Sequence, residues 1–246
     1  MEIPEEPPIE YLPIWVPPVE HKKISMTIAT FNRPKYLQNA VKSVLAQTCQ
    51  DFHLYIIDNN SLPEVKKVLD QWIGNPKITI YTTTMTEEWR SHYWGCEVCH
   101  KFAWTLGDEP YICTMSDDCE MFPDRLEKMS KFLDDNPDVQ ICFGQQVMFD
   151  INGHTRGIRG PTQVVTNGAH YIDGNQVFYR RSLNEEIYPK TKHWVVRKID
   201  GNPDVRFFEE LTKRNINMYP VDVQTEKFYF HRFHQEFEKD DALRED

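Results

Sequence analysis

The chain has 246 residues, of which 40% are hydrophobic and 13% aromatic, a composition that excludes general disorder and is typical of a globular protein. Its formal charge of −10 argues against broad contact with phosphate backbones, so we expect no nucleic-acid partner. We find no leader with a basic start and an apolar run, and no apolar stretch long enough to span a membrane, so we expect a cytoplasmic protein.

The first predicted element is a proline-rich arm at residues 1–21. It holds six of the sixteen prolines and five glutamates, and this composition disfavours both a helix and a central strand. Tyr11, Leu12 and Trp15 are apolar. We therefore expect the arm to lie on a surface, either that of the protein itself or that of a partner.

Strands and helices then alternate at the spacing of a parallel sheet. The first helix begins with Asn32 and Pro34, a cap and first-turn pair, and its apolar residues recur on one face. The pattern predicts an α/β fold with a Rossmann-like, mostly parallel central sheet and helices on both faces. We expect strands at 23–30, 52–58, 77–82 and 111–116, and helices at 34–45, 63–73, 91–106 and 123–135.

The second half of the chain is less regular. A strand from Val139 runs into a loop at 152–161 that is rich in glycine and contains arginine. Residues 169–183 then predict a strand, a turn and a final helix or strand. The sequence contains no internal repeat, and its amino-acid composition does not change between regions in the way that separate domains would suggest, so we expect a single domain. The remaining predicted segments are a helix at 202–215, a strand at 216–223 and a polar tail at 231–246.

Cys96, Cys99 and His100 have the spacing of a covalent haem attachment, and the two thiols could be half of a zinc site. Haem attachment of this kind needs export, and no second close pair of Cys or His residues would complete a zinc site. Thiols in the cytoplasm are mostly reduced. We therefore expect these residues to pack within a helix.

Polar residues follow three of the predicted strands at the same end. They are Thr30 with its neighbours Asn32 and Arg33, Asp58, and the pair Asp117 and Asp118. Ligands of open parallel sheets bind beyond this end of the strands. Neighbours on an extended chain point to opposite faces, so one of the paired acids could hold Mg²⁺ or Mn²⁺ while the other accepts hydrogen bonds from hydroxyls. The alternative is a solvated turn that caps the next helix.

Four segments in the same order resemble the family 2 inverting glycosyltransferases of the GT-A fold. They cover the nucleotide-binding start (24–61), the acidic metal motif with its helix (111–129), an acceptor-side segment (167–183) and the catalytic-base segment (203–211). The likeness is closest to the branch typified by the spore-coat polysaccharide glycosyltransferase, whose acidic motif also begins with a hydroxyl residue, here Ser116. The resemblance implies one GT-A domain, with a nucleotide-binding half at 22–120 and an acceptor-binding half, carrying a smaller β segment, at 121–230.

On the donor side, the resemblance implies that Asp58 accepts a hydrogen bond from the base of a nucleotide. Thr30, Asn32 and Arg33 would lie close to that base and to the diphosphate. Arg90 lies near a basic position of the branch, although the spacing there differs by a few residues. The donor would be a nucleotide-diphosphate sugar, with UDP or dTDP as the nucleotide.

The acidic motif would supply the ribose and metal contacts. By the same resemblance, Asp117 would contact the ribose, and Asp118 would bind the Mn²⁺ or Mg²⁺ ion that bridges the diphosphate. Because Ser116 replaces the more usual first acid, the metal affinity would be modest. Histidines near the C-terminus supply a third metal ligand in related GT-A enzymes, and His231 and His234 are candidates here, although a packed or solvent-facing position is the alternative for each.

Asp204 falls where the family has its general base, and Asp173 matches an acid on the acceptor side of the branch. The alternative is that Asp204 has no catalytic role and only stabilises the N-terminus of a helix through the helix dipole. Displacement at an anomeric carbon needs a base to take the proton of the incoming hydroxyl, which contributes about 10²–10⁴ in rate. A single displacement implies inversion, and the acceptor would be a glycan or another hydroxyl compound.

The loop at 152–161 could close over the donor or acceptor through Arg156 or Arg159, as active-site lids do. A solvated hairpin tip is the alternative interpretation of this segment.

Three other functions compete with this one. A nucleotidyltransferase would need a glycine-rich loop after the first strand, and residues 29–36 contain no glycine. An inactive GT-A module that only binds nucleotides is favoured by Ser116, whereas Asp204 and the acidic pair argue against it. A glycosyltransferase that acts on modified DNA bases shares the mechanism but conflicts with the acidic charge.

Overall fold

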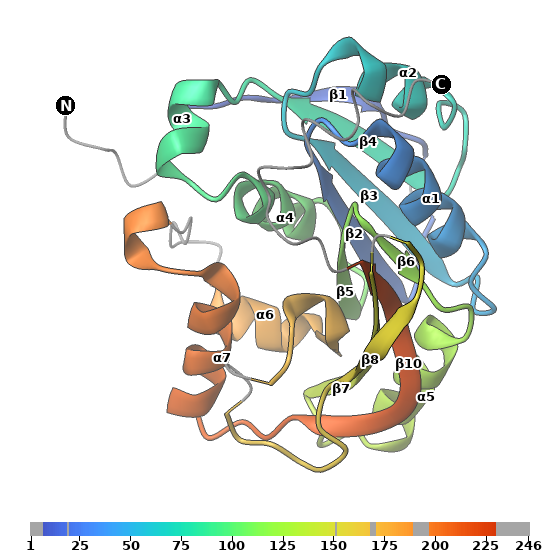
Figure 1. Cartoon of the computed structure of the whole chain (residues 1–246), viewed down its shortest axis with the longest axis vertical. Coiled ribbons are helices and arrows are strands. Elements are labelled where there is room, and N and C mark those ends of the chain that lie inside the picture. The colour runs from blue at the N-terminus through green and yellow to red at the C-terminus, as the bar shows by residue number, and fades with distance from the viewer. Residues whose placement is uncertain (1–6, 19, 151, 168–170, 189–196, 230–246) are drawn as a thin grey trace.

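The computed structural model describes residues 7–18, 20–150, 152–167, 171–188 and 197–229 (Figure 1). Four parallel strands form the centre of a twisted sheet, in the order β4, β3, β2, β5. The predicted α/β class with a mostly parallel central sheet is confirmed. These strands are β2 (Ile24–Thr30), β3 (Phe52–Asp58), β4 (Ile78–Thr83) and β5 (Tyr111–Ser116).

The rest of the sheet extends from both edges of this centre. On the far side of β5 the order continues β9, β7, β10, β6, and β8 pairs with β7 outside that row. Only β7 and β10 run parallel to each other in this part, while the other pairs are antiparallel. The bounds are β6 (Cys119–Met121), β7 (Ile141–Phe149), β8 (Thr155–Arg159), β9 (Val177–Arg180) and β10 (Tyr219–Tyr229).

Helices cover both faces of the sheet (Figure 1). On one face lie α1 (Pro34–Leu45), α2 (Pro63–Asp70) and α5 (Arg125–Asp135), which share the largest apolar cluster with β2, β3 and β4. On the other face lie α4 (Gly95–Leu106), α6 (Arg181–Ile187) and α7 (Pro203–Lys213). The short α3 (Glu87–His92) precedes α4. In the described part of the chain, no helix has the length and apolarity that crossing a bilayer requires.

Part of the predicted N-terminal arm joins the sheet. Residues Tyr11–Trp15 form β1, which pairs antiparallel with β4 at the edge of the sheet. A proline within a strand is tolerated at an edge because no neighbouring strand needs its missing N–H, and Pro13 occupies such a position. The Trp15 indole donates to the carbonyl oxygen of Asn75 at 3.0 Å, so this segment lies on the protein's own surface.

A buried ion pair connects α5 to β10. Arg125 Nη1 donates to Glu226 Oε2 at 3.0 Å, and both side chains are fully buried. The second guanidinium nitrogen donates to the backbone carbonyls of Asn175 and Val177, on either side of the end of the 3₁₀ helix η1 (Gly174–Gln176). Burial raises the pKa of Glu226 to about 7, against the opposing effect of Arg125. Arg125 therefore holds the loop before β9 in place.

Candidate active site

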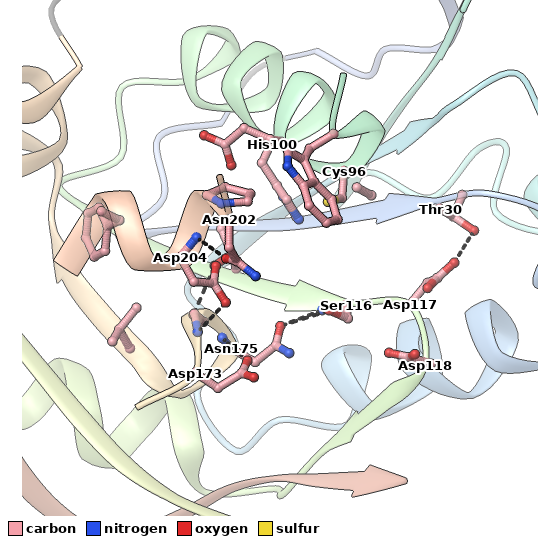
Figure 2. Close-up of a pocket in the computed structure, with 18 of the residues that line it drawn as sticks. Thr30, Cys96, His100, Ser116, Asp117, Asp118, Asp173, Asn175, Asn202 and Asp204 are labelled. Carbon is pink, nitrogen blue, oxygen red and sulfur yellow. Dashed lines mark hydrogen bonds between the residues drawn. The ribbon is translucent and has the colours of Figure 1, made fainter. Parts of the chain in front are cut away.

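A cavity of about 540 Å³ opens beyond the carboxyl ends of β2 and β5, as predicted for a sheet of this kind. Figure 2 shows Asp117 and Asp118 on one side of it and Asp173 and Asp204 on the other. Residues of α4 line a further part of the wall. The cavity is therefore built from both predicted halves of the chain.

Asp117 and Asp118 form a turn between β5 and β6 and are bridged by one arginine. Arg33 Nη1 lies 3.0 Å from Asp117 Oδ1 and 2.9 Å from Asp118 Oδ2. Thr30 Oγ1 donates to Asp117 Oδ2 at 2.8 Å (Figure 2). The sequence suggested that the two carboxylates point to opposite faces, but the chain turns at this point instead of remaining extended. Both carboxylates therefore meet the same guanidinium.

The two acids differ in their surroundings. Asp117 is almost fully buried, and burial raises its pKa while the charge of Arg33 opposes that shift. The Asp118 side chain is 15% exposed and lines the cavity. Adjacent carboxylates with room for phosphate oxygens and water suit Mg²⁺ or Mn²⁺, so these residues fit such an ion.

In the described residues, no group of three or more His, Cys, Asp or Glu side chains lies close enough together to hold a metal ion. The protein ligands found for an ion in this part of the chain are therefore limited to the acidic pair. The candidates His231 and His234 lie outside the described residues.

Asp58 does not line this cavity. Its carboxylate is fully buried, and it accepts hydrogen bonds from the Ser61 N–H at 3.1 Å and from Thr82 Oγ1 at 2.7 Å. These bonds tie the end of β3 to the following loop and to β4. The predicted contact of Asp58 with a nucleotide base stays a prediction.

Asn32 and Arg90 are not among the residues that line the cavity. Asn32 adopts a left-handed backbone conformation, with φ of 54°, and its Oδ1 accepts from the Leu62 N–H at 2.8 Å. The N-cap of α1 is therefore Arg33, and Asn32 instead joins two loops of the site. Arg90 Nη1 donates to the carbonyl oxygen of Asn59 at 3.0 Å, and its guanidinium lies 4.1 Å from the centre of the Phe31 ring.

Asp204 lies in the first turn of α7 and faces the cavity. Its Oδ2 accepts from the Gly174 N–H at 3.3 Å, and the Asn202 side chain accepts from the Asp204 N–H at 2.8 Å (Figure 2). Burial raises the pKa of Asp204 to about 6, and the charge of Asp173 adds to that shift. The result is a buried carboxyl that titrates close to neutral pH.

Asp173 performs two structural tasks at this side of the cavity. One oxygen accepts from the Asn175 N–H and caps η1, and the other receives Arg159 Nη2 at 2.6 Å. The other arginine of the predicted lid, Arg156, pairs instead with Asp150 at 2.7 Å. Both arginines lie on β8, but Arg159 pairs with an acid that lines the cavity, whereas Arg156 pairs within the hairpin of β7 and β8.

Sequence analysis missed the wall that α4 contributes. Glu97, His100 and Trp104 recur at i, i+3 and i+7, which is one helical face, and all three line the cavity. Cys99 is buried in the core as expected, whereas Cys96 and His100 line the cavity. An acid aligned with two aromatic residues on a helix was the signal that could have found this face.

Comparison with known proteins identifies the family. Residues 25–201 match the family described as Glycosyl transferase family 2. The chain belongs to this family. It is 26% identical over 185 residues to Protein CgeD of Bacillus subtilis, covering 70% of this chain and 43% of that protein. It is also 26% identical over 133 residues to the uncharacterized glycosyltransferase MJ1057 of Methanocaldococcus jannaschii, covering 53% of this chain and 44% of that one. The chain thus spans less than half the length of these curated relatives.

Solved structures show the same fold. A crystal structure of S. aureus TarS superposes with a TM-score of 0.65 at 13% identity, over 85% of this chain and 37% of the other. A structure of S. aureus TarS 1-349 in complex with UDP-GlcNAc gives a TM-score of 0.65 at 14% identity, over 86% of this chain and 60% of the other. The predicted GT-A class and the predicted family are thereby confirmed.

Proposed function

We propose that this family 2 glycosyltransferase transfers a sugar from a UDP- or dTDP-sugar to a hydroxyl of a glycan, with inversion of the anomeric carbon. The observation that carries the proposal is the placement of Asp204 in one cavity with the turn of Asp117 and Asp118. A base for the acceptor hydroxyl and acids for the donor diphosphate are the two requirements of a single displacement.

The donor assignment is supported from two sides. The fold neighbour from S. aureus was crystallised in complex with UDP-GlcNAc, which favours a uridine nucleotide for this chain as well. In this chain, Thr30 and Arg33 lie against Asp117 at the end of β2, where they would contact the base, ribose or diphosphate. Asp58 would accept a hydrogen bond from the base, with Asn32 and Arg90 nearby. The bonds of these three residues also fix the loops around the donor site.

Asp204 would take the proton of the acceptor hydroxyl. With a pKa of about 6, most of its carboxyl groups are ionised at pH 7, yet they remain more basic than an exposed aspartate. The Gly174 N–H holds the carboxylate toward the cavity. Asp173 would serve the acceptor side by holding η1 and Arg159 beside this base.

Asp118, with Asp117 beside it, would hold a Mn²⁺ or Mg²⁺ ion, and a bound ion of this kind would stabilise the negative charge of the departing diphosphate. Asp118 is the more accessible of the two acids, and its partner Arg33 could also contact the diphosphate. Arginine pairs well with phosphate oxygens because its planar fork donates two parallel hydrogen bonds.

The test is thermal stability with UDP, dTDP, GDP and CDP, each with and without Mn²⁺, followed by measurement of transfer from the sugar nucleotide of the base that binds. A ligand at 100 times its Kd adds about 2.7 kcal/mol of stability. We expect Asp118→Ala to lose the metal-dependent shift, and Asp204→Asn to keep it while losing turnover.

Full turnover in Asp204→Asn would remove the base assignment. If the wild-type protein bound a nucleotide but transferred no sugar, the inactive GT-A module would become the better interpretation.

A further inference from the structure

Glu97 is a carboxyl group that neither the fold nor the proposed chemistry uses. It lies in the first turn of α4, is 8% exposed, and lines the cavity that also contains Asp204. Within the described ranges, its carboxylate forms no hydrogen bond and no ion pair within 4 Å, although the positive charges of Lys101 and Arg206 act on it from farther away. Buried acids normally have such partners, because leaving one without them costs about 1–3 kcal/mol or more. An unpartnered buried acid that faces a cavity indicates that a ligand completes it.

The surroundings of Glu97 are aromatic. Trp94 lines the same cavity, and its indole N–H donates to the carbonyl oxygen of Gly201 at 2.8 Å, which fixes the ring. Trp104 and Tyr188 stack with ring centres 5.5 Å apart and also line the cavity. Apolar walls with a few polar groups are typical of small-molecule sites. A pyranose matches this wall, because its C–H face is apolar and its hydroxyl edge is polar.

We propose that Glu97 recognises the acceptor, and that the acceptor presents an uncharged pyranose ring to the wall formed by Trp94, Trp104 and Tyr188. This inference rests on the proposed function, since the acceptor hydroxyl must reach Asp204 in the same cavity. The polar edge of the ring would take the hydrogen bond that Glu97 lacks, and a second hydroxyl would face the base.

The charges around Glu97 favour a neutral ligand. Burial raises the pKa of Glu97 to about 8, and the charge of Asp204 adds to that shift, so the carboxyl is protonated at pH 7 and can donate to a hydroxyl oxygen. Lys101 and Arg206 act on Glu97 with the opposite sign, but Asp204, Asp173, Asp118 and Asp117 all line the cavity, so an anionic acceptor would meet more negative than positive charge there. A cationic amine would find a neutral Glu97 rather than an ion-pair partner.

The test uses direct binding, so that it does not depend on turnover. Saturation-transfer NMR in the presence of UDP and Mg²⁺ would compare methyl β-D-glucopyranoside with its 2-amino-2-deoxy and 6-phosphate analogues. We expect the neutral glucoside to bind best. Glu97→Ala should weaken it about fivefold, the effect of one lost hydrogen bond, whereas Glu97→Gln, which still donates, should retain it.

Glu88→Ala removes an exposed acid from the neighbouring α3 and is the matched control. The fold is not at risk in the Glu97 variants because no described partner loses its bond. The proposal is overturned by three results: no binding of the neutral glucoside to the wild type, equal binding to Glu97→Ala, or tighter binding of a charged analogue. UDP binding measured on the same samples tests the donor half separately, so a failure here and a failure of the proposed function can be distinguished.

Discussion

Arg33 and Asp118 form an ion pair of 2.9 Å at the turn after β5. The same guanidinium nitrogen lies 3.0 Å from Asp117, so one positive charge serves both acids. A divalent metal ion bound by these two acids would lie close to the Arg33 guanidinium. The positive charges of the metal ion and of Arg33 would then repel each other.

Removing Arg33 should therefore strengthen metal binding in the absence of nucleotide. We expect Arg33→Ala to lower the Kd for Mn²⁺ about tenfold, a change of about 1.4 kcal/mol, when free Mn²⁺ is followed by electron paramagnetic resonance. Arg156→Ala is the control, because Arg156 pairs with Asp150 in the hairpin of β7 and β8. Unchanged or weaker Mn²⁺ binding in Arg33→Ala would show that the arginine does not compete with a metal.

The pH dependence of transfer should follow Asp204. Burial raises the pKa of this carboxyl to about 6, and a base acts only when it is deprotonated. The rate kcat/KM should therefore rise as the pH increases through about 6 and level off above it. The same shift makes the stability of the fold depend on pH, because a folded-state pKa above the ordinary value means that folding favours the protonated acid. Its stabilising effect is present below the ordinary pKa of 3.8 and is lost as the pH rises through about 6.

The measurement is a pH–rate profile together with thermal unfolding across the same range. Asp204→Asn should remove the rise near pH 6 from any residual activity. A profile that is flat between pH 5 and pH 8 in the wild type would leave Asp204 without a role as base.

Gly174 sets the position of Asp204. A Cβ atom at residue 174 would lie 2.7 Å from Asp204 Oδ1, which is too close for two non-bonded atoms. Gly174→Ala should push the carboxylate away and lower kcat about tenfold or more, while the thermal shift with UDP stays unchanged. Gly153→Ala is the control on the hairpin, because no atom lies within 4 Å of a Cβ there, although its positive φ adds modest strain. Unchanged kcat in Gly174→Ala would mean that the base tolerates displacement.

The buried pair of Arg125 and Glu226 should dominate the stability of the acceptor-binding half. Arg125→Met leaves the buried Glu226 carboxyl without its cationic partner, with the Gln146 amide still donating to it, and should lower the free energy of unfolding by about 3–5 kcal/mol, measured by urea denaturation. Lys131→Ala removes an exposed ion pair with Asp135 and should cost less than about 0.5 kcal/mol. The double variant Arg125→Met, Glu226→Leu should regain part of the loss. Equal losses of unfolding free energy in Arg125→Met and Lys131→Ala would show that the buried pair does not dominate stability.

Local sequence patterns were sufficient for the elements of the first half. The periodic apolar residues of 34–45 and the continuous apolar run of 52–58 predicted α1 and β3 with the bounds that the structure has. These predictions succeed because a helix with one buried face has apolar residues every three or four positions, and a fully buried strand has a continuous apolar run. The order of strands then places Thr30, Asp117 and Asp118 at one edge.

Other features depend on contacts that no local pattern records. The bonds that the Asp58 carboxylate accepts from Ser61 and Thr82 could not be predicted, because they depend on how β4 packs beside β3. Glu97 was overlooked because one face of α4 packs on the sheet and another faces a cavity closed by α7. The turn at Asp117 and Asp118 was expected to be extended, since β6 is too short to recognise alone.

β6 follows Asp118 directly, and within the described ranges its pairing is with β10. Lys227 of β10 also reaches back 107 positions to donate to Glu120 at 3.0 Å. During synthesis on the ribosome, the acid turn therefore stays without its supporting strand until residues 219–229 have left the exit tunnel. Nascent chains stalled before that point should not bind nucleotide, and they would expose the edge of β7 to other chains or to chaperones.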